Sequence, residues 1–197
     1  MAKNKTCIFI NGLFNNYMRC FIAIEFDKNT RNFLAKIQDE LRNTGVRGNY
    51  TRVENLHLTI KFLGEIDMSV FNDVCDLIKK VSIRYKKFVL ELDKLGKFDK
   101  GNKSIVWAGI SENKYLINLF NDIESGLENI MPIKKENRYT PHITLVREAI
   151  LQPDSFGIEM SDKPGYSFEV PGISLMESTR INGRLTYIRR AFESFAV

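Results

Sequence analysis

The chain contains two histidines, and both stand in the same four-residue frame. The frames read H-L-T-I at residues 57–60 and H-I-T-L at residues 142–145. Side chains alternate along a β-strand, so each histidine and its threonine share one face while the aliphatic residues face a core. Two such strands facing each other would supply a general acid and a general base, which water attack on a phosphodiester requires.

His57 and His142 are therefore the candidate catalytic residues. An imidazole has an ordinary pKa of about 6.5, so its neutral and protonated forms both occur near neutrality. Thr59 and Thr144 could donate hydrogen bonds to the non-bridging oxygens of a phosphate and hold it between the rings. Hydroxyl groups add no charge, so cations or backbone donors would have to stabilise the developing negative charge.

Cations near the frames are candidate substrate-binding residues. Lys61 shares strand parity with His57 and could reach a phosphate, although a solvated lysine at a strand end fits the pattern equally well. Arg147 has the opposite parity to His142, so it reaches the same cleft only if the strand ends or bulges before it.

Three further side chains precede the motif strands and could stack on a base or contact a nucleic-acid backbone: Tyr50, Arg52 and Tyr139. Packing or surface roles are favoured for each one individually. Trp107 lies in an apolar strand and is expected in the core rather than at a base.

The elements that must position these residues form an α+β pattern. Helices are predicted around residues 33–41, from Asp67 to about residue 81, and over 116–130. Strands are predicted at 19–26, 50–53, 58–63, 87–92 and 104–110, after Pro141, and near 166–170, 173–179 and 185–192. Each half supplies a helix and a motif strand, which predicts a bilobal, pseudo-twofold protein whose antiparallel or mixed sheets line a central cleft, with helices packed outside.

Composition restricts the remaining possibilities. The formal charge of +5 and pI of about 9.0 suit an anionic substrate but are common among other proteins. No apolar run approaches eighteen residues, so no membrane span is expected. The three cysteines are scattered without disulfide or zinc spacing, which favours a reducing cytoplasm. We expect no metal, no cofactor and no obligate protein partner.

The strand signal after Met18 sets the expected domain boundary. Residues 1–17 are interpreted as an N-terminal extension, and residues 18–197 as a single bilobal domain.

Several segments resemble one protein family, and they occur in the family's order. They are R-C-F-I-A-I at 19–24, E-N-L-H-L-T-I-K-F-L-G-E at 54–65, V-W-A-G at 106–109, P-H-I-T-L at 141–145, and Glu177-Ser178 with Tyr187. The chain resembles the 2H phosphoesterases, and within them the RNA 2′,3′-cyclic phosphodiesterases, also called 2′-5′ RNA ligase-like proteins. Val53 stands where the family has Pro, and Val146 where it has Gly. The segment after Ile150 matches poorly.

The resemblance implies metal-independent hydrolysis of RNA 2′,3′-cyclic phosphate ends to 2′-phosphomonoesters. By analogy it implies His57 as proton donor and His142 as proton acceptor, and it favours a role for Arg147. Alternatives are another 2H activity, on small cyclic nucleotides or 2′-5′ linked oligonucleotides and including ligation, and a non-catalytic module that binds RNA ends. A zinc enzyme is the least favoured alternative.

Overall fold

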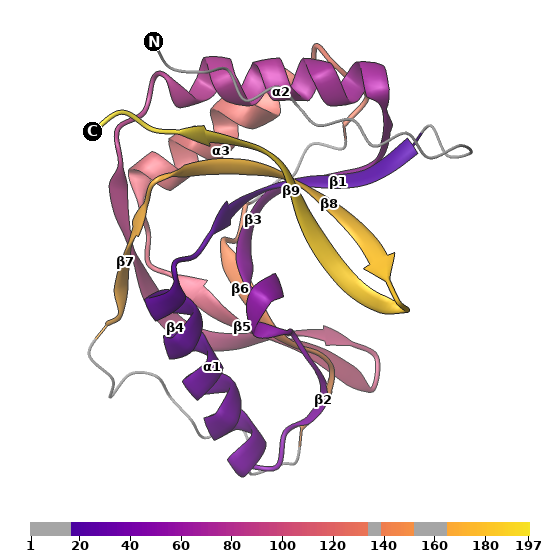
Figure 1. The fold of residues 1–197 in the computed structure, drawn as a ribbon. Coiled ribbons are helices and arrows are strands. Elements are labelled where there is room, and N and C mark those ends of the chain that lie inside the picture. Colours follow the sequence, from indigo (N-terminus) through magenta and orange to yellow (C-terminus); the bar gives the residue numbers. More distant parts are fainter. Residues whose placement is uncertain (1–16, 134–138, 152–164) are drawn as a thin grey trace.

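The computed structural model describes residues 17–133, 139–151 and 165–197. Within these ranges the chain forms two antiparallel sheets and three α-helices, which confirms the predicted α+β class (Figure 1). The expected extension lies outside the described residues apart from Tyr17, the first residue of β1. The polar run 134–137 also lies outside them.

The first sheet has four strands in the order β3-β1-β8-β9. Its strands are β1 (Tyr17–Glu25), β3 (His57–Asp67), β8 (Gly172–Ile181) and β9 (Arg184–Ser194). The first motif strand, β3, lies at the edge of this sheet as the described residues form it.

The second sheet has five strands in the order β2-β6-β5-β4-β7. They are β2 (Arg47–Tyr50), β4 (Phe88–Lys100), β5 (Lys103–Ile110), β6 (His142–Ile150) and β7 (Ser167–Val170). The second motif strand is β6, and it contacts β3 across the two sheets. The sequence motifs are therefore brought together from 85 residues apart by the packing of two separate sheets.

Each helix begins at a polar residue that caps it. In α1 (Lys28–Asn43) and α2 (Met68–Ser82), the carboxylates of Asp27 and Asp67 accept hydrogen bonds from backbone amides three residues later, at 2.8 and 2.9 Å. Asn113 caps α3 (Lys114–Leu127) in the same way. α1 packs near β6 and the short 3-10 turn η1 (Val53–Asn55), whereas α2 and α3 pack together against the first sheet (Figure 1).

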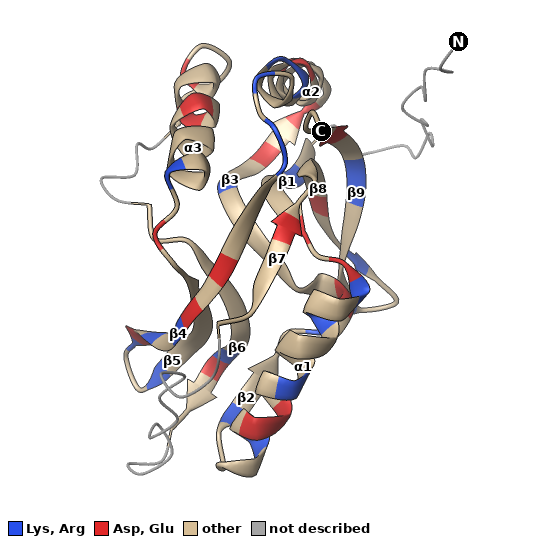
Figure 2. Cartoon of the chain, turned by 90° about the vertical axis from the view of Figure 1, so that its left-hand side faces the viewer, with Lys and Arg blue, Asp and Glu red and all other residues tan. Residues whose placement is uncertain are grey.

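One continuous cluster of buried apolar residues joins both sheets and all three helices. A second, smaller cluster lies on the first sheet and consists of Phe21, Ala23 and Met176 with Tyr187 packed against it. Basic and acidic side chains are interspersed along α1 (Figure 2). No helix in the described ranges is long and apolar enough to cross a membrane.

Two predicted strands differ from the observed ones. The strand predicted at 50–53 lies earlier, at Arg47–Tyr50, and Val53 instead begins the 3-10 turn before the first motif. β4 continues to Lys100, well past the predicted residue 92, and pairs with β5 through a turn at Gly101. The polar composition of residues 93–100 concealed this extension, because none of these side chains is fully buried at the hairpin tip.

Candidate active site

The two motif strands have the same backbone pattern for six residues. In both 57–62 and 142–147, the first and third residues are partly exposed. The second, fourth and fifth residues are buried, and the sixth is exposed. In each strand the pairing register slips by one residue, at Ile60 in β3 and at Leu145 in β6. These are β-bulges, in which two residues face one and the alternation of side chains reverses.

The bulges decide which cation reaches the site. After the bulge Lys61 points into the protein, where it is 4% exposed and its Nζ donates to Oε1 of Glu124 at 2.6 Å. The parity argument that placed Lys61 beside His57 is therefore wrong. The equivalent bulge in β6 brings Arg147 to the pocket lining. Arg147 has the same position in its strand segment as Phe62 has in β3, and Phe62 also lines the pocket.

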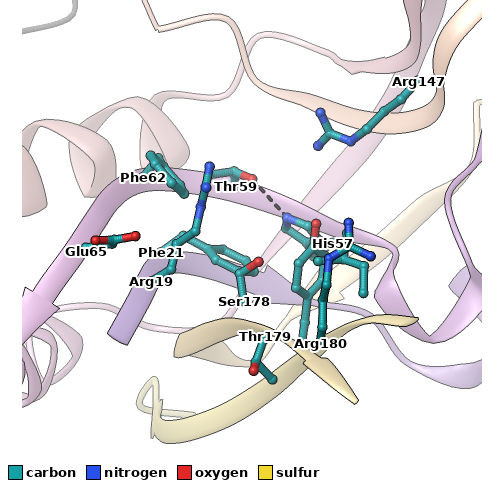
Figure 3. A pocket seen from close by; sticks show the side chains of 12 residues that line it. Arg19, Phe21, His57, Thr59, Phe62, Glu65, Arg147, Ser178, Thr179 and Arg180 are labelled. Atoms are coloured by element: carbon teal, nitrogen blue, oxygen red, sulfur yellow. Dashed lines mark hydrogen bonds between the residues drawn. The ribbon is translucent and has the colours of Figure 1, made fainter. Parts of the chain in front are cut away.

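His57 is held by its own strand and by two aromatic rings. Its Nδ1 donates to the carbonyl oxygen of Asn55 at 2.7 Å, because a carbonyl can only accept. Its Nε2 lies 3.0 Å from the hydroxyl oxygen of Thr59, on the pocket side (Figure 3). Phe21 and Tyr187 pack against the ring with centroid separations of 4.8 and 5.1 Å. The arrangement leaves Nε2 as the ring nitrogen on the pocket side.

His142 repeats this arrangement in the second sheet. Its Nδ1 donates to the carbonyl oxygen of Thr140 at 2.8 Å, again two residues earlier in the chain. Phe98 and Trp107 pack against the ring with centroid separations of 5.0 and 6.2 Å. Thr144 lies on the same partly exposed face of β6. Each histidine therefore has a carbonyl acceptor in the segment just before its strand and an aromatic support from its own sheet.

A pocket of about 530 Å³ opens beside His57 (Figure 3). Its lining consists of Arg19, Phe21, His57, Thr59, Phe62, Glu65, Arg147, Ser178, Thr179, Arg180, Leu185 and Tyr187. His142 and Thr144 are not among the lining residues, so the pocket belongs mainly to the first sheet. The lining contains three arginines and one carboxylate, so its net positive charge suits an anion.

The three pocket arginines have no carboxylate partner within 4 Å among the described residues. Elsewhere in these ranges arginines form such pairs, for example Arg190 with Glu177 and Arg189 with Glu25. Arg19 instead lies over the ring of Phe62, 5.0 Å from its centroid. The charges of Arg19, Arg147 and Arg180 are therefore available to a bound anion.

The surroundings of His57 lower its pKa to about 4 from an ordinary value of 6.5. Burial is the largest cause, because desolvation disfavours the charged ring. The hydrogen bond to the Asn55 carbonyl opposes the shift, while electrostatic interactions with Arg147 and with His142 lower the pKa further. His57 is thus neutral at pH 7 in the free protein, and His142 and Arg147 lie within electrostatic range of it.

Tyr139 links the two motif segments instead of lining the pocket. Its hydroxyl donates to the backbone carbonyl oxygen of Thr59 at 2.9 Å, and its ring stacks on Phe120 at 4.2 Å. The expectation that Tyr139 contacts substrate directly is not supported by this placement. A positioning role fits it, because it connects the chain entering β6 to the backbone of β3.

The remaining aromatic and basic candidates have structural roles. Tyr50 donates to the carbonyl of Val46 at 2.9 Å, and Arg52 pairs with Glu54. Neither residue is part of the pocket lining. Trp107 is partly exposed and supports His142, which differs from the core position expected for it.

Sequence reasoning missed the residues that enclose His57 from other strands. Phe21 and Tyr187 are 166 residues apart, and neither has a spacing relation to a motif. Arg180 and Leu185 come from a C-terminal hairpin whose position over the pocket depends on sheet order. The available signal was the family resemblance, at Phe21 in the 19–24 segment and at Tyr187. No group of three or more potential metal ligands occurs in the described ranges.

Comparison with known proteins places the chain in a family. Residues 24–107 match the family model for LigT-like phosphoesterases. A protein of Methanocaldococcus jannaschii named RNA 2′,3′-cyclic phosphodiesterase is 32% identical over 131 residues, which cover 66% of this chain and 71% of the relative. A protein of the same name from Thermotoga maritima is 26% identical over 165 residues, covering 82% and 87%.

Solved structures agree with the sequence relatives. Escherichia coli LigT complexed with 3′-AMP is 25% identical and superposes with a TM-score of 0.76, covering 92% of this chain and 99% of that one. The match extends over both sheets, beyond the segment that the family model covers. The resemblance noted in the motif segments is thereby confirmed. This chain belongs to the LigT-like phosphoesterase family.

Proposed function

We propose that this protein hydrolyses RNA 2′,3′-cyclic phosphate ends to 2′-phosphomonoesters without a metal ion, with His57 and His142 as the catalytic pair. The observation that carries the proposal is the repeated geometry, in which each imidazole donates through Nδ1 to a carbonyl two residues earlier. This leaves each Nε2 for proton transfer. The relatives from Methanocaldococcus jannaschii and Thermotoga maritima carry the name of this activity.

The proposed reaction is an in-line displacement at phosphorus. Water loses a proton to His142 as its oxygen bonds to phosphorus, the bond from phosphorus to the ribose 3′ oxygen breaks, and His57 protonates that oxygen. Thr59 and Thr144 donate to the non-bridging oxygens, and Arg147 offsets their charge. The Thr59 hydroxyl, now bonded to Nε2 of His57, would turn toward the phosphate.

The pocket supports His57 as the proton donor. The pocket lies on the His57 side and has room for a nucleoside, so the departing ribose oxygen would lie on that side as well. The role requires a protonated ring, although the pKa of about 4 leaves it neutral at pH 7. A phosphodiester anion would raise this pKa, because it opposes the cationic charges that lower it.

The test is turnover of an RNA with a 2′,3′-cyclic phosphate end in the presence of a chelator, followed by ³¹P NMR. We expect a 2′-phosphate product in the wild type and a loss of at least 10²-fold in His57→Gln and in His142→Gln. Circular dichroism of both variants controls for folding. Full turnover in either variant would exclude a paired-imidazole mechanism, and binding without turnover in the wild type would indicate an RNA-end-binding module.

A further inference from the structure

The hairpin formed by β8 and β9 extends beyond the sheet that contains it (Figure 1). β8 pairs with β1 over Ser174–Glu177, and beyond that point β9 is its strand partner in the described ranges. Asn182 and Gly183, at the tip, both have positive φ angles, of 51° and 76°. Two such residues in an N-G sequence form the tight type I′ turn of a regular hairpin. We call residues 178–187 the β8–β9 arm.

The arm forms one wall of the active-site pocket. Five of its residues line the pocket: Ser178, Thr179, Arg180, Leu185 and Tyr187. It is tied to the first motif by Asn55, whose side-chain nitrogen donates to the carbonyl oxygen of Leu185 at 3.0 Å. The backbone carbonyl of Asn55 also holds His57. The position of the arm is therefore set relative to the catalytic ring.

Arg180 is the cation that the arm brings to the pocket (Figure 3). One nitrogen of its guanidinium donates to the carbonyl oxygen of Gly183 at 2.9 Å, across the hairpin turn. A guanidinium has five N–H donors, so further donors remain for an anion. Arg190, at the base of the same hairpin, is paired with a carboxylate, whereas Arg180 has no such partner in the described ranges.

We propose that the β8–β9 arm binds the RNA strand that leads to the reacting end, and that Arg180 contacts the phosphate preceding the terminal nucleotide. The inference rests on the proposed function. Arg147 comes from β6 with His142 and is assigned to the reacting phosphate, whereas Arg180 lies on the opposite wall. Phe62 lines the same pocket, is 49% exposed with Arg19 over its ring, and offers a stacking surface there. Cations that follow the backbone, combined with an aromatic surface, are the usual means of binding single-stranded nucleic acid.

The hairpin supplies its own control residue. The register pairs Arg180 with Leu185, and Ile181 with Arg184. Cross-strand partners share a face, and Arg180 and Leu185 line the pocket while Ile181 and Arg184 do not. Arg184 is exposed and carries the same charge four residues away, so Arg184→Gln changes the net charge of the arm without touching the pocket face.

The experiment compares two substrates in the wild type, Arg180→Gln and Arg184→Gln. One substrate is a nucleoside 2′,3′-cyclic phosphate, and the other is a pentaribonucleotide with the same cyclic end. We expect Arg180→Gln to lower the ratio of kcat/KM for the oligonucleotide to that for the nucleoside by about tenfold, as loss of a charge-assisted hydrogen bond predicts. The slope of log kcat/KM against log salt should become shallower by about 0.7 for the oligonucleotide. Arg184→Gln should keep the wild-type ratio.

An unchanged ratio in Arg180→Gln, or an equal change in both variants, would overturn the proposal. Binding of a pentaribonucleotide ending in a 2′-phosphate, followed by fluorescence anisotropy, gives a second readout that does not require turnover. A wild type that hydrolyses neither substrate would refute the proposed function alone. The proposal for the arm would then still require a roughly tenfold weaker affinity in Arg180→Gln than in Arg184→Gln, and equal affinities would overturn it.

Discussion

His57 is expected to titrate far below neutrality in the free protein, and to recover part of its ordinary pKa when Arg147 is replaced. The shift from 6.5 to about 4 corresponds to about 3 kcal/mol of preference for the neutral ring, at 1.36 kcal/mol per pKa unit. Burial is the largest cause, so Arg147→Gln should raise the pKa without restoring it to 6.5. At pH 7 about one His57 in a thousand would be protonated in the wild type.

The assay is a pH titration of the histidine ring nitrogens and protons by NMR. The chain has two histidines, so the spectrum contains two sets of ring signals, and His142→Gln identifies the set that belongs to His57. Addition of a nucleoside 2′-phosphate should raise the pKa of His57, as the role of proton donor requires. A free-protein value near 6.5 would refute the reasoning, because it would mean that the ring is not desolvated.

The same shift predicts how stability depends on pH. Between pH 6.5 and about 4 the unfolded chain binds a proton at residue 57 that the folded protein does not bind. Stability contributed by the neutral ring is therefore present above pH 6.5 and is lost as the pH falls, up to about 3 kcal/mol near pH 4. Urea denaturation of wild type and His57→Gln at pH 7 and pH 4.5 measures this difference. Parallel losses in the two proteins would contradict it.

Three substitutions test the support around the site. A side chain in Gly96→Ala would overlap the ring of Trp107, so we expect a lower kcat and a shifted emission of this single tryptophan; unchanged emission would contradict the placement. Lys61→Met should cost about 3 kcal/mol in urea denaturation by removing a partner of buried Glu124, and the double variant with Glu124→Gln should regain much of it. Tyr139→Phe should cost about 1 kcal/mol and lower kcat several-fold, and unaltered kcat would show that its hydroxyl does not align the motif strands.

The alternation of side chains along a strand correctly predicted the relative placement of His57 and Thr59 within the first motif. His57 and Thr59 share the pocket face, as a period of two requires. The same rule failed two residues later at Lys61, because a bulge depends on pairing with a neighbouring strand that the motif itself does not encode. Arg147 was recovered through the family resemblance, and the second bulge supplies its physical reason.

The rest of the site depends on contacts between distant parts of the chain. Phe21, Tyr187 and Arg180 lie around the same pocket as His57 because β3, β1, β8 and β9 are consecutive in the first sheet, and strand order has no local signal. The charge of Arg180 was visible in the sequence, but so were those of Arg189 and Arg190, which pair with carboxylates. Separating a binding arginine from a structural one required knowing which carboxylates lie within reach.

The carbonyl that orients each histidine comes from the histidine's own chain segment, and this separates two properties of the proposed catalytic pair. A rigid shift of one sheet against the other would change the distance between the two Nε2 atoms without rotating either ring relative to its strand. The tautomer of each ring and the distance between the two Nε2 atoms can therefore vary independently. Substitutions between the sheets would alter the rate through distance, whereas substitutions before each motif would alter it through protonation, and the pH dependence of kcat would distinguish the two kinds of variant.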